Sequence, residues 1–347
     1  MKKLGICAVY TLTEEASSLK AITEKRPIAA LPFASRYRLI DFALSNASEA
    51  NISSLALFIG KSGRSIYDHI RSGKPWDLDS HISGGIFTFS QQFYKYSIGA
   101  ELGFDRSFYE DLITFVKRSK TSHVFISGSQ ILATLDIKDI RDKHVESGKD
   151  ITSVFSSQLG QLMNMYMVSV DFLMDLIDRA VEEDMYFEAD DLIRHYLKYY
   201  EINTYVHQGY TANINSDRAY YQANMDMLEG DKFDGLFNNG VPIVTKEKHG
   251  APTFYTDTAK VRTSLLATDC VIRGTVDHSL IFRRVDILEG ATVKNSIIMQ
   301  GSRIEEGAQV DYAILDKGVV VKAGQVIKGT PDNLVIVTKD TVPEMSY

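Results

Sequence analysis

The first two thirds of the chain alternate short apolar runs with segments of helical period. Apolar runs of the kind found in buried strands occur at 4–10, 54–60, 123–127, 151–156 and 165–170. Apolar residues spaced three or four apart predict helices at 38–51, 65–73, 108–120, 170–184, 190–200 and 217–231. This alternation predicts a Rossmann-like α/β domain over residues 1–235, with a mostly parallel sheet covered by helices on both faces.

From residue 261 the pattern changes to a repeat of 17 residues. When 290–306 is aligned with 307–323, Val293 falls on Val310 and Ile304 on Val321. Buried β-branched residues that recur at short, fixed intervals between small corner residues are typical of a parallel β-helix. We therefore expect a β-helix over 261–347. The intervening residues 236–260 are rich in glycine and proline and are expected to form a linker.

Composition indicates which kinds of partner the protein binds and in which cellular compartment it is expected. The 347 residues carry a net charge of −7, which argues against a large nucleic-acid surface. No apolar run is long enough for a membrane span, and the N-terminal residues do not have the pattern of a signal peptide. Cys7 and Cys270 both lie in apolar runs, as expected of reduced core residues. These features favour a cytoplasmic protein that binds neither nucleic acid nor membranes.

Four sequence words carry a resemblance to a known family. They are EKRPIAALPFASRYRLIDFALSN (24–46), SGKPWDLD (72–79), YYQANMDML (220–228) and VKNSIIMQGSRIEEGA (293–308). They resemble bacterial glucose-1-phosphate adenylyltransferase, which makes ADP-glucose and pyrophosphate from ATP and glucose 1-phosphate. The resemblance implies a nucleotidyltransferase-like domain followed by a left-handed β-helix that mediates subunit contacts.

The turn after the first strand departs from that family. The family has a glycine-rich loop for the triphosphate here, whereas this chain reads TLTEEASS (11–18), without glycine and with Glu14 and Glu15. Two carboxylates would repel phosphate, because such loops bind anions through close backbone N–H groups. We interpret this turn as one that no longer serves triphosphate binding.

Three further positions differ where the family places its chemistry. Ile28 stands where the family has a lysine, and Ser129 and Asn213 stand where it has the two aspartates that hold Mg²⁺. Neutral oxygens lack the negative charge that Mg²⁺ prefers. The resemblance therefore implies that this chain has no catalytic residues and no metal site of its own. The chain is also shorter than the family between residues 156 and 163, through a deletion or through a loop missing from the sequence.

Other residues allow two interpretations each. Lys25, Arg26 and Arg38 match positions that bind phosphorylated effectors in the family, or they form a solvated basic surface. Trp76, the only tryptophan, packs on a nucleotide or anchors a loop. His278 resembles the coil histidine that serves as base in β-helix acyltransferases, or it is a solvated corner residue.

Together these departures resemble the GlgD-type regulatory subunits of the family. The resemblance implies that the chain binds no cofactor, that Mg²⁺ belongs to a catalytic partner subunit, and that the two form a hetero-oligomer, a tetramer in the family. Sugar phosphates or adenine nucleotides are the expected effectors. Two alternatives remain open: an active enzyme with substituted metal ligands, and a β-helix acyltransferase or assembly protein.

Overall fold

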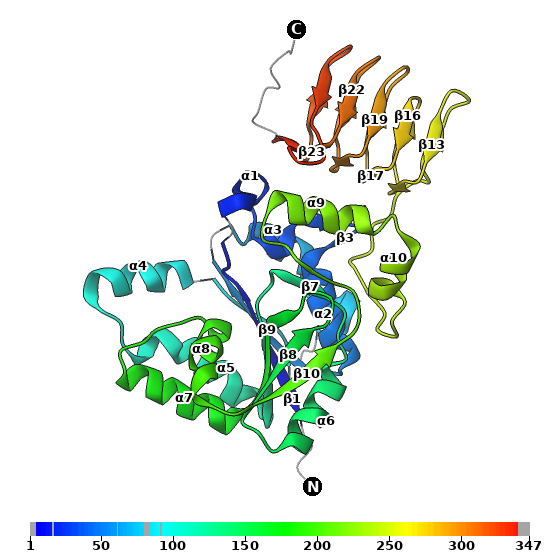
Figure 1. The fold of residues 1–347 in the computed structure, drawn as a ribbon. Coiled ribbons are helices and arrows are strands. Elements are labelled where there is room, and N and C mark those ends of the chain that lie inside the picture. The colour runs from blue at the N-terminus through cyan, green and yellow to red at the C-terminus, as the bar shows by residue number, and fades with distance from the viewer. Residues whose placement is uncertain (1–4, 16, 61, 80–83, 91, 339–347) are drawn as a thin grey trace.

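The computed structural model describes residues 5–338 except 16, 61, 80–83 and 91. An α/β domain forms the larger part, and a β-helix stands at one end of it (Figure 1). The central sheet has the order β10-β8-β9-β6-β1-β4-β5. Its strands are β1 (Ile6–Leu12), β4 (Ser54–Ile59), β5 (Gly85–Phe89), β6 (His123–Ser127), β8 (Ile151–Ser156), β9 (Gln161–Ser169) and β10 (Ile202–His207). Only β9 runs antiparallel to its neighbours, which confirms the mostly parallel sheet.

Helices cover both faces of this sheet, as predicted. Alternate residues of β1 separate two cores, with Ala8 and Tyr10 in one and Cys7 and Val9 in the other. The first core is covered by α2 (Leu39–Glu49), α3 (Arg64–Ile70) and α6 (Ile137–Ser147). The second is covered by α5 (Glu110–Ser119), α7 (Val170–Glu182) and α8 (Ala189–Tyr196). Cys7 and Cys270 are buried and free.

Smaller elements complete the α/β domain. They are α1 (Lys20–Thr23), the 3₁₀ turns Ile28–Ala30 and Lys74–Trp76, β2 (Pro32–Phe33), β3 (Tyr37–Arg38), β7 (Ile131–Ala133) and β11 (Thr211–Asn213). A further helix, α4 (Gln92–Leu102), projects from the domain (Figure 1). The single helix expected over 217–231 is instead two, α9 (Asp217–Asp226) and α10 (Gly230–Phe237). The second begins at Gly230, a residue of low helix propensity that favours a break at this point.

The β-helix consists of three parallel sheets. They are β12 (Phe254–Tyr255), β15 (Val271–Ile272), β18 (Asp286–Ile287), β21 (Arg303–Ile304) and β24 (Val320–Val321); β13 (Lys260–Arg262), β16 (Thr275–Asp277), β19 (Thr292–Lys294), β22 (Gln309–Asp311) and β25 (Val326–Lys328); and β14 (Leu265–Leu266), β17 (Leu280–Ile281), β20 (Ile297–Ile298), β23 (Ala313–Leu315) and β26 (Val335–Val337). Val276 pairs with Val293, and Val293 with Val310, which confirms the 17-residue register. His278 has a φ of 45° and lies at a coil corner, equivalent to Asn295 with a φ of 43°.

One sheet of the β-helix also forms the joint with the α/β domain. Ile281 and Ile298 point into the coil, whereas their neighbours Leu280 and Ile297 share a core with the α/β domain. Hydrogen bonds across the joint include one from the Tyr221 hydroxyl of α9 to the Asn295 carbonyl at 2.7 Å. The two domains therefore meet through a packed apolar interface.

Candidate functional site

A cavity of about 240 Å³ lies where β1 and β6 end, the edge at which parallel sheets usually bind ligands. Its lining is mostly polar and includes Glu14, Gln130, Asn164, Arg194 and Asn213. The cleft therefore lies where the family resemblance places the nucleotide site.

Glu14, in the turn after β1, is hydrogen-bonded to the loop after β6. Its Oε2 accepts hydrogen bonds from the backbone N–H and the hydroxyl of Ser129, each at 2.6 Å, and its Oε1 accepts one from the Gln130 N–H at 3.3 Å. A Cβ atom at Gly128 would lie 2.1 Å from Glu14 Oε1, so glycine is required for this close approach. The altered metal position thus donates hydrogen bonds to a carboxylate from another part of the chain.

A second carboxylate, Asp190 at the start of α8, reaches the same place. It accepts hydrogen bonds from the Thr11 hydroxyl and the Asn164 amide, both at 2.6 Å. Burial, with the charge of Asp190 as the next cause, raises the pKa of Glu14 to about 7, and burial raises the pKa of Asp190 to about 6. The cleft therefore disfavours negative charge, whether that charge lies on these carboxyl groups or on a phosphate.

The other altered positions lie close to this loop or in the nearby core. Asn213 of β11 pairs with Ile131 of β7, two residues beyond Ser129, so the structure brings together the two positions that the resemblance matches to metal-binding aspartates. Within the described residues the Asn213 Oδ1 is buried and has no hydrogen-bond partner. Ile28 is 2% exposed and packs in an apolar core with Leu31, where a lysine could not keep its charge solvated.

These side chains fit a Mg²⁺ ion poorly. Both oxygens of Glu14 and both of Asp190 already accept hydrogen bonds from the chain. Their raised pKa values also favour protons over a metal, whereas Mg²⁺ prefers ionised carboxylates and water. Among the described residues, no group of three or more acidic, histidine or cysteine side chains is arranged to hold a metal ion.

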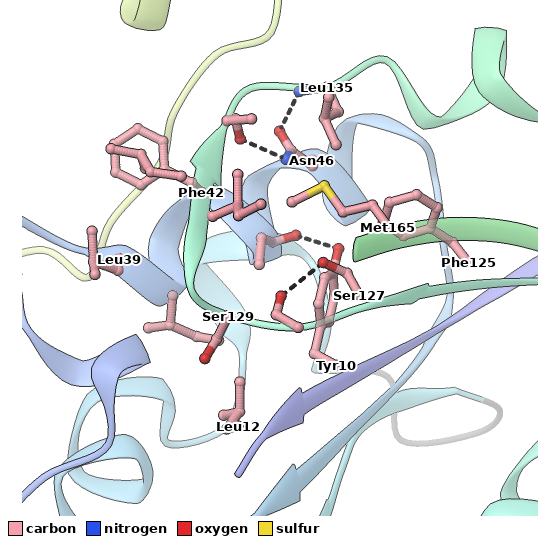
Figure 2. A pocket seen from close by; sticks show the side chains of 16 residues that line it. Tyr10, Leu12, Leu39, Phe42, Asn46, Phe125, Ser127, Ser129, Leu135 and Met165 are labelled. Carbon is pink, nitrogen blue, oxygen red and sulfur yellow. Dashed lines mark hydrogen bonds between the residues drawn. The ribbon is translucent and has the colours of Figure 1, made fainter. Parts of the chain in front are cut away.

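Helix α2 fixes the strand that follows this loop. Figure 2 shows Asn46 of α2 beneath it, where its amide donates to the Ala133 carbonyl at 3.1 Å and accepts from the Leu135 N–H at 3.0 Å. The cavity among these residues, bordered by Ser127 and Ser129, measures only about 30 Å³. It has room for about one water molecule, so this part of the site is a rigid support rather than a binding pocket.

The predicted effector residues lie at or near the joint between the domains. Arg26 is buried and its guanidinium bonds both carboxylate oxygens of Asp316 at 2.5 Å. The exposed Lys25 lines the same cavity of about 440 Å³ as Arg26, Asp316 and Lys317. Burial, followed by repulsion from Arg26, lowers the pKa of Lys317 to about 8. Arg38 lies apart from this lining and donates to the Ser65 carbonyl at 2.5 Å.

Trp76 is fully buried, and its indole N–H donates to the Val244 carbonyl at 3.1 Å. Ser45 of α2 also accepts from the Val244 N–H at 2.9 Å. The ring thus anchors the connector between the domains, and a nucleotide could stack on it only by displacing that connector.

Sequence reasoning missed several residues that shape these sites. Asp190 lies in the unremarkable helical segment 190–200, and Asp316 and Lys317 lie in a turn of the β-helix. From the sequence, Glu14 is expected only to repel phosphate, and its contact with Ser129 is not predicted. A pair of acidic residues directly after a buried strand was the one signal that pointed to the cleft.

This chain is similar to one family model and to a number of known proteins, of which three are described. The model described as "GlmU-like, C-terminal hexapeptide" matches residues 252–333. "Glycogen biosynthesis protein GlgD" of Geobacillus stearothermophilus is 37% identical, over 84% of this chain and 82% of the relative. The protein of the same name in Bacillus subtilis (strain 168) is 34% identical, over 79% and 78%. "Glucose-1-phosphate adenylyltransferase" of Bacillus cytotoxicus is 24% identical, over 84% and 86%.

These matches agree with the resemblance read from the four sequence words and with the two-domain architecture. In the described part of the chain, no helix is both long enough and apolar enough to cross a bilayer. From its similarity to both relatives over most of their length, the chain belongs to the GlgD family of glycogen biosynthesis proteins, which is related to glucose-1-phosphate adenylyltransferase.

Proposed function

We propose that this chain is a cytoplasmic, catalytically impaired regulatory subunit of glucose-1-phosphate adenylyltransferase. The observation that carries the proposal is the contact between Glu14 and Ser129, which fills the former reaction centre with the chain's own carboxylate. In the assembly, a catalytic partner would hold Mg²⁺ and convert ATP and glucose 1-phosphate into ADP-glucose and pyrophosphate.

Electrostatics supports the loss of catalysis. Phosphoryl transfer depends on cations and N–H groups that neutralise the charge developing on the phosphates. Here Glu14 follows β1 and Asp190 lies near it at the start of α8. The buried Ile28 stands where the resemblance places a lysine, and the two positions matched to metal-binding aspartates are neutral. A triphosphate would have to approach two buried carboxyl groups without a metal ion between them.

The joint between the domains supports a regulatory role. Lys25, Arg26 and Lys317 line one cavity with contributions from both domains. A phosphorylated sugar or an adenine nucleotide bound there would contact both, and could shift their arrangement through its differential affinity for two states. Arg26 could bind such an anion only by exchanging it for Asp316, so effector binding would be coupled to an interdomain contact.

The test compares the chain alone, the catalytic subunit alone, and the two co-expressed as a hetero-oligomer. The chain alone should release pyrophosphate from ATP and glucose 1-phosphate near background, and mixing should change the partner's rate or its response to sugar phosphates. Lys25→Ala in this chain should weaken the effector response, whereas Arg303→Ala, on the solvent side of the β-helix, serves as the control. Substantial turnover by the chain alone, or mixing that changes neither rate nor response, would overturn the proposal.

A further inference from the structure

The loop after β6 presents several hydrogen-bond donors to one point. The N–H groups of Ser129 and Gln130 and the Ser129 hydroxyl all bond the Glu14 carboxylate. Successive backbone N–H groups that converge in this way form an anion-binding nest. The anion that occupies this nest is a side chain from 115 residues earlier in the sequence.

We propose that Glu14 is an internal substitute for a phosphate ligand, an autoinhibitory contact that keeps the cleft closed to external phosphate groups. The proposal concerns the isolated chain and does not depend on its proposed effect on a partner. It differs from a mere loss of phosphate binding, because this loop has a set of converging donors and they are occupied from within.

The geometry around the contact supports a closing role rather than a chance surface bond. Glu14 is partly buried, and its carboxyl group lies directly against Gly128. Any residue other than glycine at position 128 would collide with it. Both oxygens are used, with bonds of 2.6 Å to Ser129. Three hydrogen bonds from two successive residues thus hold this one side chain against the loop.

Removal of Glu14 would change the charge balance of the cleft. Asp190 would remain, with its oxygens bonded to Thr11 and Asn164, so it would not replace Glu14 on the loop. Arg194 lines the same cavity and is paired with Asp191 at 2.6 Å. The freed donors would then face the cavity without a partner, which suits a phosphate or pyrophosphate group without metal.

The test follows hydrogen exchange of the Ser129 and Gln130 amides in the full-length protein, with inorganic pyrophosphate as the probe and a chelator present. This local readout separates the cleft from the basic interdomain cavity, which is the same in every variant. The variants are Glu14→Ala, Glu14→Gln and, as the control, Glu15→Ala on the exposed side of the same turn. Far-UV circular dichroism checks that each one folds.

In the wild type and in Glu15→Ala, the two amides should exchange slowly and pyrophosphate should change nothing. In Glu14→Ala, exchange should rise at least about tenfold, and millimolar pyrophosphate should restore protection. Glu14→Gln should stay closed, because its amide oxygen still accepts both bonds from Ser129.

Three results would overturn the proposal: unchanged exchange in Glu14→Ala, no restored protection by pyrophosphate in that variant, or Glu14→Gln opening as far as Glu14→Ala. If Glu14→Ala does not fold, protection of the wild-type loop by pyrophosphate would still contradict closure. None of these results bears on co-purification with a catalytic subunit, so the two proposals can fail independently.

Discussion

The buried ion pair between Arg26 and Asp316 is expected to decide how firmly the two domains hold together. Each residue is 8% exposed, and the pair joins the segment 24–46 of the α/β domain to a turn of the β-helix. We predict that Asp316→Asn destabilises the protein more than Arg26→Met. Asp316→Asn leaves the Arg26 charge buried beside Lys317 without its carboxylate partner. The two cations repel each other, and this repulsion already contributes to the lowered pKa of Lys317. Arg26→Met leaves an aspartate that still accepts the Lys317 N–H at 2.7 Å.

The expected magnitude follows from the cost of an uncompensated buried charge, about 3–5 kcal/mol. At about 2.1 cal/mol/K per residue, unfolding of 347 residues has an entropy of about 0.7 kcal/mol/K. The unfolding midpoint of Asp316→Asn should therefore fall by about 4–7 °C, and that of Arg26→Met by less. The double variant should lie within about 1.5 kcal/mol of the wild type, because removing both charges leaves neither unpaired.

Thermal unfolding followed by two probes measures these effects. Fluorescence of Trp76, the only tryptophan, reports on the α/β domain, and far-UV circular dichroism reports on the whole chain. The two transitions should coincide in the wild type and separate in Asp316→Asn, because the domains lose part of their coupling. A midpoint within 1 °C of the wild type for Asp316→Asn, or a double variant as unstable as that single one, would refute the reasoning.

Three further predictions concern the α/β domain. Burial raises the pKa of Glu188 from 4.5 to about 8, so its proton stabilises the folded state at low pH and this stability is lost as the pH rises through 8. In urea unfolding, the wild type should therefore lose about 1.4 kcal/mol of stability between pH 7 and 9, relative to Glu188→Gln. Equal pH profiles of the two proteins would contradict this. Ser129→Asp would place a carboxylate where the hydroxyl now lies 2.6 Å from Glu14, so it should lower the urea midpoint without creating pyrophosphate release; a more stable or active variant would be evidence against closure. Trp76→Phe should cost about 1–3 kcal/mol in urea unfolding followed by circular dichroism, because the smaller ring leaves space in the core and the Val244 carbonyl keeps only its bond from the Ser45 hydroxyl at 3.2 Å. A cost near zero would count against the anchoring role.

The central strands could be predicted from the sequence because they are buried on both faces and read as continuous apolar runs. The edge strands β5 and β10 were missed, since each leaves several side chains exposed and their patterns are weak. The repeat of the β-helix was predictable because its coil interior demands the same residue type every 17 positions. The joint between the domains could not be predicted. Outward positions of the coil such as Leu280 and Ile297 are apolar because they pack against the α/β domain, and the repeat itself gives no sign of that contact.

The site was predictable only as far as the resemblance extended. Ser129 and Asn213 could be aligned with the family's metal positions, and the structure brings them near each other, because Asn213 of β11 pairs with Ile131 of β7. The partner of Ser129 could not be found in this way, because Glu14 is 115 residues distant and the contact depends on how the ends of two parallel strands meet. Short sequence motifs indicate the family, whereas the contact between Glu14 and Ser129 depends on the tertiary structure.

The structure also shows why single substitutions should not return this cleft to phosphate chemistry. An aspartate at 129 would face Glu14, and a lysine at 28 would enter an apolar core without a partner. The acidic groups gather at the strand ends, whereas Arg26 and Lys317 gather at the joint. Carboxyl groups thus lie in the cleft and cationic groups line the interdomain cavity, which is the distribution of charge that a subunit needs if it responds to a phosphorylated ligand without transforming it.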